Sequence, residues 1–220
     1  MPPDAAITRL TDLDPAIALF HPLIGLGRFD DASALFRTRL DDALYYRLGA
    51  GRLRYEILTH LLPQGPGEAP RVSQPLDQAL VLGMEAKGAM FLGHLEEAIG
   101  RFQEAIKRIA HVPDNGGCDL TVMAGDLQET CHFERPSNVV RVCLSELSLA
   151  QRLAGHLWSA EQVACRALAM GRRAAQVFEV EVHLYRVGLV LSARGATAEA
   201  DEAFRESLVI WQQSRLYREL

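Results

Sequence analysis

Residues 184–208 carry two successive apolar stripes, and each has the periodicity of a helix with one buried face. The first stripe recurs at spacings of three and four residues and comprises Leu184, Val187, Gly188 and Leu191. The second stripe follows Gly195 and comprises Ala200, Phe204 and Leu208. Such spacings place each set on one side of a helix. Since the small Gly188 and Ala200 suit a close crossing of two helices, the stretch predicts a self-contained helical hairpin.

The order of large, small, aromatic and small residues in this hairpin resembles the tetratricopeptide repeat (TPR), a unit of about 34 residues. A second stretch follows the order closely after Gly93, with Leu95, Ala98, Phe102, Ala105 and Ile106. Two other stretches depart from it, because Arg39 occupies a usually small position and Ala164 replaces the usual aromatic residue. The resemblance implies four repeats, at about 14–48, 76–109, 139–170 and 181–214.

Two segments interrupt these repeats. Residues 63–75 begin with a concentration of proline and glycine that cannot continue a helix, and we interpret them as a linker. Residues 111–138 lack a clear pattern, and we interpret them as an insert. The turn glycines are unequally spaced, at Gly27, Gly93, Gly155 and Gly195, which excludes a strict array. This irregular style resembles the degenerate TPR-like arrays of bacterial multidomain regulators, including signalling ATPases of the STAND class.

Together these patterns predict one all-α domain over residues 1–220. We expect a right-handed α-solenoid of antiparallel helical hairpins, TPR-like, with about nine or ten helices that are stabilised by packing between neighbours. The resemblance carries over the array and not an ATPase activity. Gly83 and Gly88 have the glycine spacing of a phosphate-binding loop, but Ala89 and Met90 follow them instead of lysine and a hydroxyl residue.

Composition narrows the range of partners. The formal net charge of −5 argues against a nucleic-acid partner, because phosphate binding normally needs a basic face. No apolar run is long enough to cross a membrane, and the first four residues, Met1 to Asp4, do not look like a signal peptide. The four cysteines show no paired framework, so we expect reduced thiols and a cytoplasmic protein.

Catalytic and metal motifs are weak. The seven histidines are scattered, and no Gly-x-Ser-x-Gly elbow is present, so we predict a non-catalytic protein without a cofactor. Cys118, Cys131 and His132 cluster within the insert, but their spacing is not that of a zinc site, and no metal is predicted. Cys143 and Cys165 lie within helical patterns and are interpreted as small core residues.

Surface recognition is therefore the leading prediction. In the TPR family the first helix of each repeat lines a concave face that often holds the ligand, and the resemblance implies that Lys87, Ser145, Arg152 and Tyr185 line it here. An arginine and a lysine on such a face suit a peptide that carries a carboxylate. The alternative for each residue is an ordinary solvated side chain.

The C-terminal end supplies a second candidate surface, because repeat arrays usually end in a helix with a polar outer face. Here the end is apolar and aromatic, with Val209, Ile210, Trp211, Leu216 and Tyr217. These side chains either fold back on the array or meet a partner or a second copy. A sequence cut from a longer chain would show the same apolar end. A homodimer through this helix would use Ile210, Trp211, Leu216 and Tyr217.

Three functions follow from these observations. The first is a non-catalytic protein- or peptide-binding scaffold or sensor of a bacterial regulatory system. The second is a small-molecule sensor or metal-dependent enzyme that uses the insert 111–138 over the binding face. The third is a self-association domain built on the Trp211 end.

The repeat register can be tested by Phe102→Ala. The pattern predicts that Phe102 is buried between helices, and the loss of such a side chain typically costs about 3–5 kcal/mol of stability. Urea unfolding of wild type and variant measures the difference. A change near zero would contradict the register.

Overall fold

The structure is a computed structural model that describes residues 7–63, 68–110, 112, 136–174 and 177–218. Side chains are described only from Glu179 onward in the eighth helix and only up to Gln213 in the ninth. The described residues form helices, turns and loops without strands, so the predicted all-α class is confirmed. The α-helices are α1 (Asp14–Gly25), α2 (Phe29–Leu35), α3 (Gly51–Thr59), α4 (Pro75–Phe91), α5 (Leu95–Ile109), α6 (Pro136–Leu153), α7 (Leu157–Arg173), α8 (Val177–Ala193) and α9 (Thr197–Arg218).

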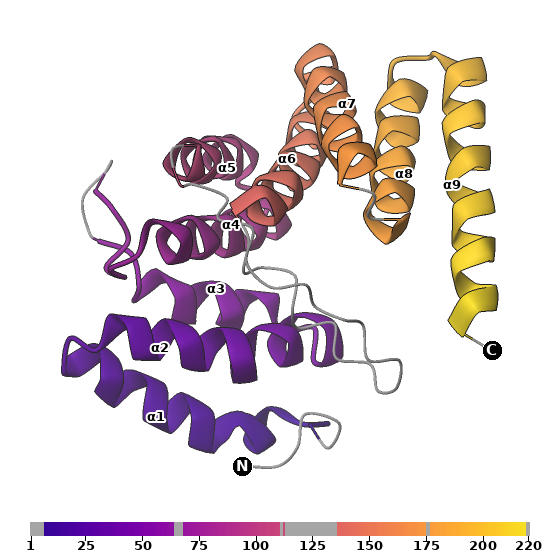
Figure 1. Cartoon of the computed structure of the whole chain (residues 1–220). Coiled ribbons are helices and arrows are strands. Elements are labelled where there is room, and N and C mark those ends of the chain that lie inside the picture. The colour runs from indigo at the N-terminus through magenta and orange to yellow at the C-terminus, as the bar shows by residue number, and fades with distance from the viewer. Residues whose placement is uncertain (1–6, 64–67, 111, 113–135, 175–176, 219–220) are drawn as a thin grey trace.

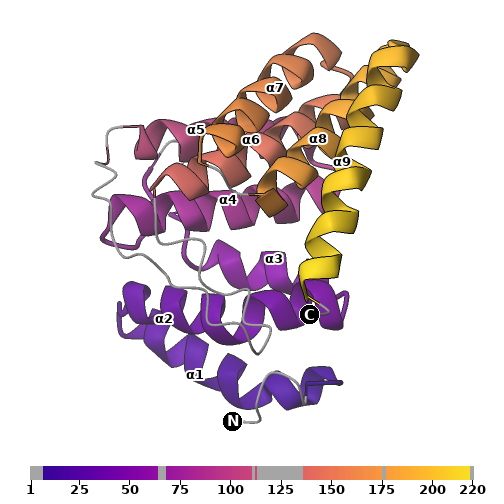
Figure 2. The ribbon, with the colours of Figure 1, turned by 45° about the vertical axis from the view of Figure 1, so that its right-hand side comes forward.

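The helices pack in chain order as an elongated array, a TPR-like α-solenoid (Figure 1). The pairs α4–α5, α6–α7 and α8–α9 are antiparallel hairpins, and each hairpin packs on the next. In Figure 1 helices α1 to α4 run across the view, whereas α8 and α9 run close to vertical. Figure 2 shows the same change of direction from another side, so the helices rotate progressively along the array.

Each hairpin turns through a glycine with a left-handed backbone. Gly93 and Gly155 have φ values of +86° and +84°, which side chains other than glycine rarely adopt. After Gly93 the amide of His94 donates to the carbonyl of Ala89 at 2.9 Å, which satisfies an orphan carbonyl of α4. The turn glycines expected from the sequence are confirmed at these positions.

The last hairpin crosses closely at Gly188. A Cβ atom on Gly188 of α8 would lie 2.5 Å from Cε1 of Phe204 in α9, so the phenyl ring occupies the space that a side chain would need. Ala200, one turn before Phe204, is buried. The predicted close crossing at Gly188 is therefore confirmed, and Ala200 is buried.

The second helix of the first repeat is not a regular α-helix. It continues from α2 through two π-helical segments, η3 (Phe36–Leu40) and η4 (Ala43–Arg47). A π-helical turn accommodates an extra residue, so the core-facing position shifts along the chain. Leu40 is buried and Arg39 is only partly buried. The π-helical turn thus explains why Arg39 breaks the sequence pattern.

The segment after α3 is attached to the first repeat. The amide of Arg71 donates to the carbonyl of Leu61 at 2.9 Å, and the amide of Ser73 donates to Asp30 Oδ1 at 2.7 Å. Val72, between them, is buried. The described C-terminal part of the predicted linker 63–75 therefore packs on the array, next to α4.

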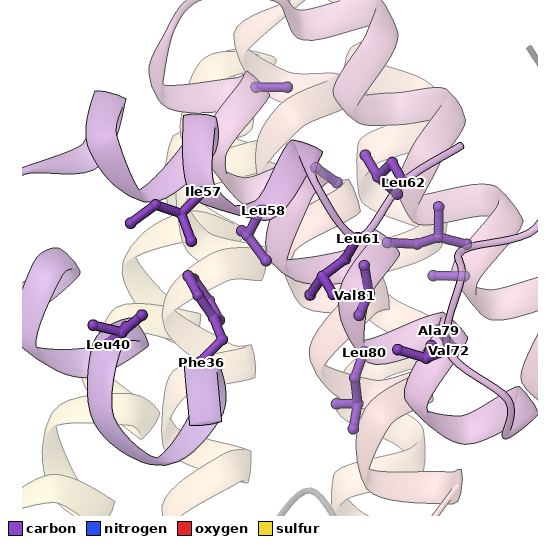
Figure 3. Packing of buried hydrophobic residues seen from close by; sticks show 14 of the residues in the cluster. Phe36, Leu40, Ile57, Leu58, Leu61, Leu62, Val72, Ala79, Leu80 and Val81 are labelled. Atoms are coloured by element: carbon purple, nitrogen blue, oxygen red, sulfur yellow. The ribbon is translucent and has the colours of Figure 1, made fainter. Parts of the chain in front are cut away.

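The core consists of two clusters. The larger extends from Ile7 to Ala150, and Figure 3 shows part of it, where Ile57 and Leu58 of α3 lie opposite Phe36 and Leu40. Phe102 belongs to this cluster and is buried, as the register predicted. The smaller cluster joins α7, α8 and α9 and comprises Ala164, Leu168, Val180, Leu184, Val187 and Ala203.

Two glycine substitutions should have opposite effects. Gly188→Ala inserts a Cβ against the Phe204 ring and should destabilise the protein by about 1–3 kcal/mol, the usual cost of overpacking. Gly100→Ala in α5 meets no atom within 4 Å and should stabilise the helix by up to about 1 kcal/mol. Thermal unfolding of both variants measures this, and equal effects would contradict the close crossing.

Candidate functional site on the first helices

Helices α4, α6 and α8, the first helices of three successive repeats, form one layer of the array. α4 packs on α6, and α6 packs on α8, whereas the second helices α5, α7 and α9 pack far less on one another within the described residues. We call the exposed surface of α4, α6 and α8, together with the adjoining segment η4, the first-helix face.

Lys87 of α4 lies on a pair of tyrosines from η4. Its Nζ atom is 4.2 Å from the ring centroid of Tyr45 and 5.5 Å from that of Tyr46. The amine also donates a long hydrogen bond of 3.5 Å to the hydroxyl of Tyr46. Cation–π contacts of this kind are worth about 0.5–2 kcal/mol. They hold the lysine on the rings and fix the position of its charge.

The tyrosine pair is part of a larger aromatic group. The rings of Tyr45 and Tyr46 meet edge to face at 4.5 Å, and the ring of Phe91 in α4 meets Tyr45 at 5.2 Å. Tyr45 is partly buried, whereas Tyr46 is 70% and Phe91 57% exposed. An exposed aromatic surface thus borders the lysine.

A buried arginine supports this group from behind. Arg54 of α3 is 2% exposed, and its Nε donates to Asp41 Oδ1 at 2.6 Å. Its Nη1 donates to the carbonyl of Met84 in α4 at 2.8 Å, and its guanidinium lies 5.4 Å from the Tyr45 centroid. One side chain thus ties α3, α4 and the π-helical segments together, so the tyrosines are held by a rigid base.

Charges alternate across the three first helices. Burial lowers the pKa of Lys87, but nearby Glu146 of α6 and the two tyrosines outweigh this effect, so the net shift is upward and the amine stays charged. Glu146 in turn lies 3.4 Å from Nη2 of Arg186 in α8. Lysine, glutamate and arginine thus form a positive, negative, positive row along α4, α6 and α8.

The contact between α6 and α8 is also polar at its buried end. Arg141 of α6 pairs with Glu179 of α8, and its Nη2 donates to Asn138 Oδ1 at 2.5 Å. His183 of α8 is 3% exposed, and neither ring nitrogen has a hydrogen-bond partner. Burial lowers the pKa of His183 to about 4, and the charges of Glu179, Arg141 and Arg186 act on it as well. Its imidazole is therefore neutral at neutral pH.

The four residues predicted for the binding face lie in different environments. Lys87 is half-buried in the aromatic group, and Arg152 of α6 is half-buried with Nε lacking a partner. Ser145 is buried, 5% exposed, and so offers little surface to a ligand. Tyr185 is exposed, and its ring lies 5.8 Å from that of Phe204 in α9. The structure therefore joins Lys87 to residues that the sequence analysis did not select.

Those additional residues are Tyr45, Tyr46, Phe91, Glu146 and Arg186. Glu146 and Arg186 carry a detectable signal, because each stands nine residues before its turn glycine and equivalent positions of neighbouring repeats lie side by side. The tyrosines carry no such signal, since they come from an irregular helix that the repeat pattern does not describe.

The C-terminal helix keeps some apolar surface exposed. Ile210 is only partly buried and packs against the smaller core cluster, whereas Trp211 is 43% exposed. The side chains of the other two predicted interface residues, Leu216 and Tyr217, lie outside the described residues. Leu208 and Val209, each about half exposed, extend the apolar surface next to Trp211.

The cysteines and the insert give no metal site in what is described. Residues 113–135, which include Cys118, Cys131 and His132, lie outside the described residues. Within the described ranges, no group of three His, Cys, Asp or Glu side chains could hold a metal ion. Cys143 is buried as predicted, but Cys165 is exposed, because it lies on the outer side of α7; the prediction for Cys165 was wrong.

A membrane-spanning helix is not found in the parts of the chain that the structure describes, since none there combines the necessary length and apolar character.

Comparison with known proteins identifies the architecture. No family model and no curated protein matches the sequence. Two similar crystal structures contain nearly identical TPR-like repeats of a Podosopora anserina protein assigned as a kinesin light chain, one of them a single-residue variant. The variant structure is 14% identical with a TM-score of 0.56 and covers 93% of this chain and 96% of its own. The other is 14% identical with a TM-score of 0.54, covering 92% and 96%.

These similarities establish the fold and not the function. At such low identity, function depends on the site that each protein carries. The resemblance to TPR-like repeats is thus confirmed as architecture, over nearly the whole chain.

The buried histidine predicts a specific pH dependence. The pKa of His183 is lowered to about 4 in the folded protein. As pH falls, the imidazole is therefore protonated near pH 6.5 in the unfolded chain but only near pH 4 in the folded chain. Stability should therefore fall as pH decreases from 6.5 towards 4, by up to about 1.4 kcal/mol per pH unit. Urea unfolding at several pH values should show this loss for wild type and a smaller one for His183→Leu.

The comparison must be made against wild type at each pH, because Glu85 acts in the opposite direction. Burial raises the pKa of Glu85 to about 7 despite the nearby Arg101, so its contribution to stability is lost as pH rises through 7. His94→Leu, which removes an exposed histidine, is the matched control substitution. Identical profiles for wild type and His183→Leu would contradict the assignment.

Proposed function

We propose that this chain is a non-catalytic interaction module, a TPR-like scaffold or sensor, that binds a protein or peptide on its first-helix face. The observation that carries the proposal is the position of Lys87, a charged amine held on two tyrosines beside the exposed ring of Phe91. A solvated surface lysine has no need of such a base. Such a base is useful to a lysine whose charge must be held at one fixed position.

The chemistry of this surface favours an acidic and partly apolar ligand. Lys87 can receive a carboxylate, and the Tyr46 hydroxyl is a hydrogen-bond donor next to it. Tyr46 and Phe91 offer exposed aromatic area for an apolar neighbour of that carboxylate. Arg152 is a further cationic contact on α6. Glu146 replaces Ser145 as the α6 residue that acts on the site, through its effect on Lys87.

We place the module in a regulatory system of the bacterial cytoplasm. This part of the proposal is supported by the resemblance of the unequally spaced repeats to the degenerate arrays of multidomain regulators. The alternative of a small-molecule sensor or metal-dependent enzyme depends on the insert 111–138, and most of that insert lies outside the described residues.

A second candidate function is self-association through α9. It is favoured by the apolar surface of Leu208, Val209 and Trp211, which is exposed on α9. This surface and the first-helix face involve different residues, so the two functions are compatible.

Peptide selection tests the binding proposal directly. A random peptide library selected on the purified protein should yield sequences enriched in aspartate and glutamate next to apolar residues. The best peptide should bind Lys87→Gln and Tyr46→Ala roughly tenfold more weakly than wild type in calorimetry, the loss of about 1.4 kcal/mol expected for one charged or aromatic contact.

Lys107→Gln is the matched control, because Lys107 is exposed on α5, a second helix away from the first-helix face. It should leave the affinity unchanged. Thermal unfolding must show that Lys87→Gln is folded. Equal affinities of the two lysine variants, or selected peptides without acidic residues, would contradict the proposal.

A further inference from the structure

The outer face of α9 carries apolar residues at positions that are covered in the other repeats. Counted from the turn glycine, Leu208 is equivalent to Ile106 of α5 and Leu168 of α7. Ile106 is partly buried and Leu168 is buried, and in each case another helix packs on the second helix that carries it. Leu208 is 51% exposed. Its position in the array is thus one that a further helix normally covers.

Two more residues follow the same rule. Trp211 is equivalent to the buried Ile109, yet it is 43% exposed. Tyr185 of α8 is equivalent to Ser145 of α6, which is buried. In Figures 1 and 2 α9 has α8 on one side and no described helix on the other. We call this surface the end face; it comprises Tyr185, Leu208 and Trp211.

The charges on α9 indicate what covers the end face. Asp201, Leu208 and Arg215 are spaced seven residues apart, so they occupy one side of the helix. Asp201 is exposed and pairs with Arg205, one turn on, which is exposed as well. The sequence of this side thus runs from an acidic position through an apolar centre to a basic position.

We propose that two copies of the chain associate through α9, with the helices antiparallel about a twofold axis at Leu208. This inference rests on the self-association candidate, and the residues that it pairs lie on α9, apart from Lys87 and its two tyrosines. About that axis Leu208 meets its own copy, and Asp201 lies opposite the position of Arg215 in the second chain. Arg205 then lies opposite Trp211, an arrangement suited to a cation–π contact.

A parallel pair is disfavoured by the same residues. It would place Asp201 against Asp201 and Arg205 against Arg205 along the contact, and like charges across an interface reduce affinity. The antiparallel pair is isologous, so it closes as a dimer and does not extend into a filament. With 22 residues α9 is about 33 Å long, enough for several turns of contact.

Charge reversal tests both the dimer and its direction. Sedimentation equilibrium of wild type should give twice the chain mass of 24.3 kDa. Asp201→Arg should weaken the dimer at least tenfold, because each interface then sets two pairs of arginines against each other. The double variant Asp201→Arg/Arg215→Asp should restore it. Glu202→Arg makes the same charge change away from this side of α9 and should leave the dimer intact.

The outcomes separate this inference from the others. A monomeric wild type overturns the dimer, and a dimer that Asp201→Arg does not weaken, or that the double variant does not restore, overturns the antiparallel pairing about Leu208. Asp201→Arg should not change the affinity of the first-helix face for the selected peptide. The dimer and the peptide site can therefore each fail without affecting the test of the other. An open-ended increase in mass with concentration also overturns the closed dimer.

Discussion

The structure depends on packing between neighbouring helices, because no hairpin of this chain can bury its apolar side alone. Close crossings such as Gly188 against Phe204 hold the two helices of a hairpin together. The contact from one hairpin to the next is more variable. From α1 to α6 it is one continuous apolar cluster, whereas α6 and α8 meet through the ion pairs Arg141–Glu179 and Glu146–Arg186. Buried ion pairs of this kind add little net stability, because the cost of removing the charges from water offsets their attraction.

Repetition of a hairpin also determines where charged side chains come together. Equivalent positions of adjacent repeats lie side by side, so a charge on one first helix meets whatever stands at that position in the next. Glu146 and Arg186 are such a pair. Glu96 of α5 and His156, which precedes α7, also approach at 3.4 Å on the other layer, although they do not stand at equivalent positions. A functional surface can therefore be built from single substitutions in successive repeats, without any change in the fold.

The sequence predicted the fold well because its signals are local. The turn glycines, the buried Phe102 and the crossing at Gly188 each follow from spacing within one hairpin. The site was predicted only in part, because it depends on geometry between hairpins. Ser145 was expected to face a ligand but is buried within the array. Tyr45 and Tyr46 come from a π-helical segment, which shifts the register away from the repeat pattern. The prediction that Cys165 is buried was wrong for a related reason, since a helical pattern does not by itself show which side of the helix is buried.

The covering of one helix by the next also explains how the two proposed surfaces differ. A position that a following helix covers in one repeat is exposed wherever no described helix packs on it. Tyr185 of α8 and Leu208 of α9 are therefore exposed, whereas their equivalents are buried or partly buried. The end face is thus a consequence of repetition, and a second copy can serve as the covering neighbour. The first-helix face has the opposite origin, because Lys87 and its tyrosines lie where the first repeat departs from regularity. Pairing at α9 would leave that irregular site intact in each chain, so the dimer would present two copies of it to a ligand and raise avidity without new contacts.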